Sequence, residues 1–106
     1  MVAALINVPK NARNGDVIEI KTLMSHIMET GYRHTTSGQV VPRDIITSFT
    51  CRFEGEEIFR ADLFPATAAN PFFSFFTVVT RSGKFDFEWI GDNGFSETAS
   101  ANITVE

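Results

Sequence analysis

Apolar and polar residues alternate near the end of the chain, where Phe85, Phe87 and Trp89 are interleaved with charged residues. A period of two places these three rings on one side of a β-strand. The segment 91–94, Gly-Asp-Asn-Gly, predicts a turn, because Gly and Asn adopt positive φ at low cost. Alternation resumes over 97–106, so we predict a β-hairpin with one apolar face and one solvated face.

The same period predicts further strands earlier in the chain. We expect them at 2–8, from 17 to about 25, at 45–53, 57–63 and 72–79. Polar or proline-bounded connections separate them, at 10–15, 29–39, 54–56, 64–71 and 81–83. About seven short strands with regular turn signals, and no convincing long helix, predict an all-β fold. We therefore expect an antiparallel β-sandwich of the immunoglobulin or fibronectin kind.

Composition narrows the class of protein. The 106 residues suit one domain, so we expect a single sandwich over 1–106. A net charge of −4 argues against nucleic acid as a partner, because phosphate binding needs a basic surface. No apolar run is long enough to predict a membrane span, and the N-terminal run is too short for a signal peptide. Taken alone, these features predict a cytoplasmic protein.

The segment 72–79 is apolar on both of its predicted faces. Phe73, Phe75, Thr77 and Val79 form one row, and Phe72, Phe76 and Val78 form the other. A strand at the surface of a sandwich buries only one face. Either the connection 64–71 folds over the second row, or the row is an exposed aromatic patch of the kind that marks a protein interface. We favour the interface.

Side chains that could carry chemistry do not form a recognisable site. His26 and His34 could bind a metal with Glu29, but nothing in their spacing requires this, and we expect both to be exposed loop histidines. Cys51 lies between apolar neighbours on a predicted strand, where a thiol is buried and unreactive. No nucleophile elbow or phosphate-binding loop is present. We therefore expect no enzyme activity, no cofactor and no metal.

Five segments, taken together and in this order, resemble the SoxZ family. They are Ile-Asn-Val-Pro at 6–9, Met-Glu-Thr-Gly at 28–31, Val-Pro-Arg-Asp-Ile-Ile at 41–46, Ala-Ala-Asn-Pro at 68–71 and Trp-Ile-Gly-Asp-Asn-Gly-Phe at 89–95. SoxZ proteins are the Z subunits of the SoxYZ carrier complex of thiosulfate oxidation. The resemblance covers nearly the whole chain, although no single segment would be specific.

The resemblance implies an immunoglobulin-like sandwich that forms a heterodimer with SoxY. In that family a cysteine on a glycine-flanked arm at the end of SoxY carries the sulfur intermediates. The segment 103–106, Ile-Thr-Val-Glu, has neither feature, so we expect this chain to be the non-catalytic scaffold half. It would present the partner's arm to the sulfur-oxidation enzymes that visit the complex. The family is periplasmic, so the resemblance also implies co-export with a partner that bears a twin-arginine signal.

We assign candidate site residues on this basis. The expected partner interface consists of Phe64, Phe72, Phe75, Phe76 and Val78. The expected surface-recognition residues are Asn70, Pro71, Asp92 and Asn93. The alternative function is a stand-alone sandwich that binds a sugar or peptide on an aromatic platform. That alternative would require exposed Trp and Tyr side chains, whereas Trp89 is predicted to face a core.

Overall fold

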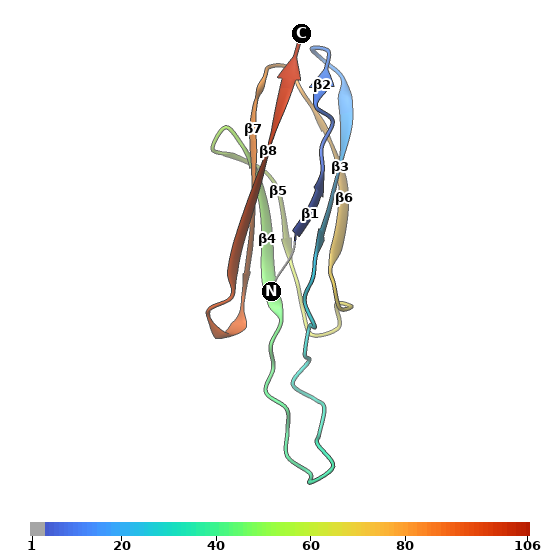
Figure 1. Ribbon diagram of the computed structural model, residues 1–106, viewed down its shortest axis with the longest axis vertical. Helices are drawn as coiled ribbons and strands as arrows, with labels where there is room; N and C mark the ends of the chain where they lie inside the picture. The colour runs from blue at the N-terminus through green and yellow to red at the C-terminus, as the bar shows by residue number, and fades with distance from the viewer. Residues whose placement is uncertain (1–3) are drawn as a thin grey trace.

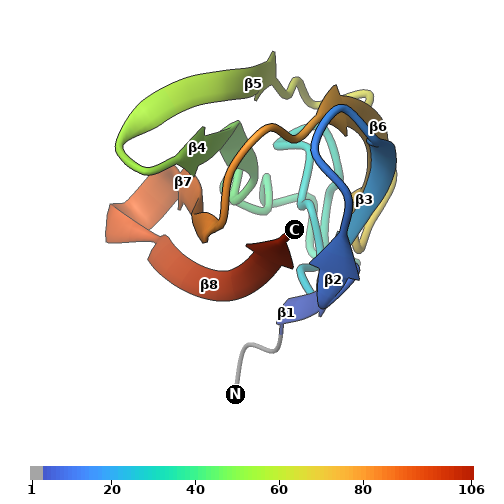
Figure 2. The same cartoon turned by 90° about the horizontal axis from the view of Figure 1, so that it is seen from above.

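The structure is a computed structural model that describes residues 4–106, which form two packed β-sheets (Figure 1). The smaller sheet has the order β1-β3-β6, with β1 at Ala4–Asn7, β3 at Val17–Met24 and β6 at Phe72–Val78. The larger sheet has the order β2-β8-β7-β4-β5. Its strands are β2 at Asn11–Ala12, β4 at Ile46–Phe53, β5 at Glu56–Asp62, β7 at Gly83–Gly91 and β8 at Ser96–Val105. The end-on view shows the two layers (Figure 2).

The predicted all-β sandwich is confirmed, with one departure from purely antiparallel pairing. The expected hairpin is β7 and β8, joined by the short 3₁₀ turn η1 at Asp92–Gly94. The departure is β2, which lies in the segment expected to be a polar turn and pairs in parallel with β8. The chain thus leaves one sheet after β1 and joins the other at β2. Residues 2 and 3 of the strand predicted at 2–8 lie outside the described part of the chain.

Aromatic rings fill the space between the sheets. Phe85, Phe87 and Trp89 of β7 are each at most 1% exposed, as their alternation predicts. Phe49 of β4 lies at the centre, stacked on Phe73 of β6 with 4.9 Å between ring centroids. Burial of this much aromatic surface is the main stabilising contribution expected from the core.

The predicted alternation fails at the start of β4. A period of two over the predicted strand 45–53 puts Ile45 and Thr47 on the core side with Phe49, but the pairing of β4 with β7 shifts by one residue between Ile46 and Ser48. Ile45 is buried as expected, but Ile46 is also fully buried and Thr47 is only half-buried. The Thr47 hydroxyl instead donates to the carbonyl of Ile90 at 3.1 Å. An inserted residue of this kind reverses the inward and outward positions on either side of it.

A long connection between β3 and β4 projects beyond one end of the sandwich (Figure 1). It contains the predicted loop 29–39, and it has little apolar packing of its own. Backbone hydrogen bonds in both directions between Glu29 and Asp44 close its base. Arg33, four residues along the same arm, donates to the Glu29 carboxylate at 2.7 Å. No helix in residues 4–106 is long and apolar enough to cross a membrane.

Phe75 and Phe76 offer a matched pair of substitutions, because they are adjacent and lie on opposite faces of β6. Phe75→Ala should lower the free energy of unfolding by about 3–5 kcal/mol, since it leaves a cavity in the aromatic core. Phe76 is 67% exposed, so Phe76→Ala should change that energy by less than about 0.5 kcal/mol. Urea denaturation of dilute protein measures both. Equal losses would contradict the assignment of the two faces.

Candidate functional site

The candidate residues fall in two places, the outer face of the β1-β3-β6 sheet and a pocket at the loop end of the sandwich. On the outer face, Phe72, Phe76 and Val78 are 58%, 67% and 58% exposed. The connection between β5 and β6 therefore does not cover this row. We call Phe72, Phe76 and Val78 the outer row of β6.

Two apolar patches extend from the outer row onto the neighbouring strands. Phe72 lies opposite Leu23 of β3, and Leu23 lies opposite Leu5 of β1. Leu5 is itself 64% exposed, and a shallow pocket of about 270 Å³ lies between it and Phe72. At the other end of β6, Val78 lies opposite Val17, which is 65% exposed. Exposed apolar side chains thus gather at both ends of the sheet face.

A short polar strip separates the two patches. The hydroxyl of Ser74 donates to the Glu19 carboxylate at 2.6 Å, and Lys21 lies 3.7 Å from the same carboxylate. These charges offset each other within the face. The face therefore presents an apolar and nearly neutral surface, which distinguishes it from a site for a charged ligand.

The structure corrects the assignment of Phe75 to the partner interface. Its ring is 8% exposed and stacks on Phe59 of β5, with 4.2 Å between centroids and 3° between ring planes. Phe75 belongs to the inward row of β6, whereas Phe72 and Phe76 point outward. Phe64 is 64% exposed and lies in the connection between β5 and β6. Phe64 thus remains accessible to another chain.

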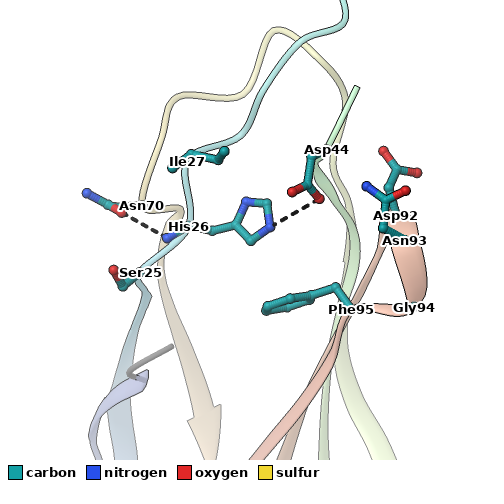
Figure 3. A pocket seen from close by; sticks show the side chains of 9 residues that line it. All are labelled: Ser25, His26, Ile27, Asp44, Asn70, Asp92, Asn93, Gly94 and Phe95. Carbon is teal, nitrogen blue, oxygen red and sulfur yellow. Dashed lines mark hydrogen bonds and ion pairs between the residues drawn. The ribbon is translucent and has the colours of Figure 1, made fainter. Parts of the chain in front are cut away.

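The pocket lies where the long loop, the β5–β6 connection and the β7–β8 turn meet, and it has a volume of about 420 Å³. Figure 3 shows its lining, which includes three of the four expected recognition residues, Asn70, Asp92 and Asn93. The structure corrects the fourth assignment, Pro71. This residue is buried, and its carbonyl accepts the N–H of Met24. Pro71 anchors the start of β6 and is not a surface residue.

His26 is the most constrained side chain of the pocket. It was expected to be exposed, but its side chain is only 7% exposed and its ring packs edge-on against Phe95. Its Nδ1 accepts the N–H of Met28 at 3.0 Å, so the neutral ring carries its proton on Nε2. Nε2 points toward the Asp44 carboxylate, 3.8 Å away (Figure 3). With both nitrogens directed in this way, His26 is poorly placed to act as a general base.

Asp92 and Arg43 fasten the long loop to the β7–β8 turn. Arg43 donates to both carboxylate oxygens of Asp92, at 2.8 and 2.9 Å, and the N–H of Ile45 donates to one of them. The Arg43 guanidinium holds the pKa of the Asp92 carboxyl below its ordinary value of 3.8. Gly91 lets the backbones approach here, because a side-chain carbon at this position would lie 2.6 Å from the carbonyl oxygen of Ile45. Asp92 is thus used structurally.

The two asparagines have different roles. Asn70 has a positive φ of 53°, and its side-chain oxygen accepts the N–H of His26 at 2.9 Å. It therefore connects the β5–β6 connection to the long loop. Asn93 also has a positive φ, 58°, at the exposed tip of the β7–β8 turn. Its amide makes no hydrogen bond to the described residues, so Asn93 is the member of this set most available to an outside partner.

Reactive groups do not come together elsewhere in residues 4–106. No three His, Cys, Asp or Glu side chains in this range are arranged to hold a metal ion, and His26, His34 and Glu29 are no exception. Cys51 is fully buried, as predicted. Burial, with a smaller contribution from Asp86, raises the pKa of the Cys51 thiol to about 12. At neutral pH this thiol is therefore protonated and a poor nucleophile.

Comparison with protein families shows which family this chain belongs to. Residues 6–102 match the family described as sulphur oxidation protein SoxZ. This chain belongs to the SoxZ family. The match includes every residue of the five segments that carried the resemblance. Comparison of this SoxZ-family chain with curated proteins gave no match.

Solved structures of other proteins share the fold of this SoxZ-family chain. The sulfur carrier protein SoxY from Chlorobium limicola f thiosulfatophilum aligns with a TM-score of 0.70 and 14% identity, over 98% of this chain and 79% of that one. A superoxide reductase (neelaredoxin) from Ignicoccus hospitalis aligns with a TM-score of 0.75 and 17% identity, over 97% of this chain and 80% of that one. Identities this low establish a common fold and leave function open.

The pH dependence of stability should report the Arg43–Asp92 pair. Because the pKa of Asp92 is lowered in the folded state, the pair contributes stability above about 3.8 and loses it as pH falls through the folded value. Asp92→Asn should therefore be less stable than the parent at neutral pH, and the difference should vanish in strong acid. Urea denaturation across this pH range measures it.

Asp62→Asn is the matched control. Asp62 pairs with Arg60 at 3.5 Å on an exposed edge, with side-chain exposures of 60% and 55%. An exposed pair of this kind contributes about 0.2–1 kcal/mol or nothing measurable. If Asp92→Asn behaves like this control at neutral pH, the closure of the loop by Asp92 is contradicted.

Proposed function

We propose that this chain is the non-catalytic scaffold subunit of a SoxYZ-type carrier heterodimer. In this proposal a SoxY-like partner carries sulfur intermediates on its terminal cysteine during thiosulfate oxidation. The observation that carries the proposal is the outer row of β6, Phe72, Phe76 and Val78, exposed on a sheet face with little net charge. Membership of the SoxZ family supports it.

The outer row is the kind of surface that an obligate partner covers. Obligate interfaces are more apolar than the rest of a protein surface, and their cores are enriched in aromatic residues. Leu5 and Val17 are exposed by 64% and 65%, which extends the apolar surface onto β1 and β3. Phe64, in the connection between β5 and β6, is also 64% exposed. Such a surface left in water promotes self-association. A partner that stays bound would remove this liability.

The state of Cys51 supports a division of labour between two chains. Sulfur carriage on a cysteine requires an accessible thiolate that exchanges its load with other proteins. Cys51 is fully buried among core side chains, with a pKa of about 12. This thiol is unsuited to carry cargo, so the proposal places the carrier cysteine on the partner. The role left to this chain is to hold the partner's domain and orient its arm.

The proposal includes two further elements. The complex works in the periplasm and reaches it by co-export with a partner that bears a twin-arginine signal. Enzymes of sulfur oxidation contact the complex transiently, and we place one such contact at the loop end, where Asn93 leaves its amide free on an exposed turn. Neither nucleic acid nor membrane is a partner in this proposal.

The alternative of a stand-alone ligand-binding sandwich gains no support from the aromatic side chains. Trp89, the best stacking residue, is completely buried between the sheets. Tyr32 is 76% exposed, but it lies in the long connection between β3 and β4 and not among the residues of the outer row. Phenylalanine rings alone lack the polar groups that a sugar platform combines with stacking.

Isolation of the chain from its source under native conditions tests the proposal. We expect a second subunit with a cysteine in a glycine-rich terminal arm to be recovered in equal amount. Size-exclusion chromatography with mass spectrometry of the recovered complex measures this. A monomer that is stable alone, and that ignores a SoxY-like chain from the same source, would refute the proposal.

Phe76→Lys tests the contribution of the outer row. It places a charge at the centre of the proposed interface, so the affinity for the partner should fall by at least about a hundredfold. Ile27→Lys is the control, because Ile27 is 68% exposed but lies in the pocket at the loop end. It should leave affinity unchanged. Titration calorimetry of both variants measures the effect, and equal affinities would contradict the placement of the interface.

A further inference from the structure

The free edge of β6 carries a row of backbone groups that the described residues leave unpaired. β6 pairs with β3 on one side only, without a register shift. At one end of the ladder the N–H of Met24 donates to Pro71, and at the other the N–H of Val79 donates to Asp16. Because hydrogen-bonded pairs alternate along an antiparallel ladder, Phe73, Phe75 and Thr77 bond to β3.

The residues that alternate with Phe73, Phe75 and Thr77 must therefore direct their N–H and C=O groups away from β3. These residues are Phe72, Ser74, Phe76 and Val78. Within residues 4–106, these backbone groups form no hydrogen bond to another residue. Three of the four also expose their side chains as the outer row. The strand thus offers apolar side chains and free backbone groups from the same positions.

β5, at one edge of the larger sheet, is protected against pairing in a way that β6 is not. β5 forms one edge of the larger sheet, and its seven residues include Glu56, Glu57, Arg60 and Asp62. Charged residues on an edge strand oppose pairing with another chain. The remaining edge strands are β1 and β2, which have only four and two residues. β2 covers only the end of β8, so residues 96–103 of β8 have a neighbour on one side only, and this stretch includes the charged Glu97. β6 has seven residues and includes no charge, proline or bulge.

We infer that β6 receives a β-strand of the SoxY-like partner, so that one continuous sheet spans the two subunits. The inference rests on the proposed function and specifies how the partner binds. Backbone groups arranged for a ladder select an extended strand over a helix or a flat surface. The SoxY fold matches 98% of this chain, so a SoxY-like partner has a strand at the position of β6. We assign that strand as the occupant.

Hydrogen exchange of individual amides separates strand pairing from simple face-to-face packing. In the free chain, the amides of Phe73, Phe75 and Thr77 should be protected, and those of Ser74 and Phe76 should exchange rapidly. In the complex, Ser74 and Phe76 should gain at least about tenfold protection, because they enter a ladder. Exchange measured by NMR on the free chain and on the complex gives each value.

Ser74→Pro tests the same point by mutation. The Ser74 N–H faces the free edge, so proline there removes a donor to the incoming strand and leaves the β3 ladder intact. Binding to the SoxY-like partner should weaken by at least about tenfold. Ser74→Ala removes the hydroxyl bond to Glu19 but keeps the N–H, and it should bind like the parent. If Ser74→Pro does not fold, the exchange measurement on the parent protein still decides.

The outcomes distinguish the two levels of the proposal. A complex that forms without added protection at Ser74 and Phe76 would overturn strand pairing and leave the scaffold function intact. Failure to form any complex with a SoxY-like chain would overturn both. Protection already present in a homodimer of this chain, which the SoxY-like partner does not displace, would overturn the assignment of the occupant to the partner.

Discussion

Stacking of the inward rings of β6 on the larger sheet is the interaction on which the rest of the structure depends. Phe73 stacks on Phe49, and Phe75 stacks on Phe59, with centroid distances of 4.9 and 4.2 Å. These contacts fix which side of β6 faces the core. Since side chains alternate along a strand, they also force Phe72 and Phe76 outward. The exposed aromatic surface is therefore a direct consequence of the packed core.

The same constraint explains why the chain is better suited to assembly than to chemistry. The core holds the one cysteine as a protonated, inaccessible thiol. At the loop end, His26, Asp44, Asp92 and Arg43 bind to one another and fasten the loop to the sandwich. What remains available to other molecules is the apolar outer face, the free edge of β6 and the tip of the β7–β8 turn. These are features of a binding partner.

Much of the fold could be predicted because it depends on local alternation. The hairpin of β7 and β8 and the two faces of β6 each follow from a period of two over seven or more residues. The site was less predictable, because its contacts join distant segments. Arg43 and Asp92 are 49 residues apart, and nothing near either residue indicates the other. The burial of His26 depends likewise on Phe95, which lies between η1 and β8, far from His26 in the sequence.

Three other departures have causes that leave no clear trace in the sequence. β2 is only two residues long, and it exists because β8 lies beside it. The register shift at Thr47 interrupts an alternation that looks regular in the sequence. Pro71 was expected at the surface beside Asn70, but its carbonyl is needed at the first rung of the β3–β6 ladder.

A crystal structure of the chain bound to the SoxY-like subunit from its source would test the central claim most directly. The account predicts that β6 lies inside a sheet shared by both chains, with Phe72, Phe76 and Val78 covered by the partner. A complex in which the partner binds elsewhere, and the edge and outer row of β6 still face solvent, would contradict it.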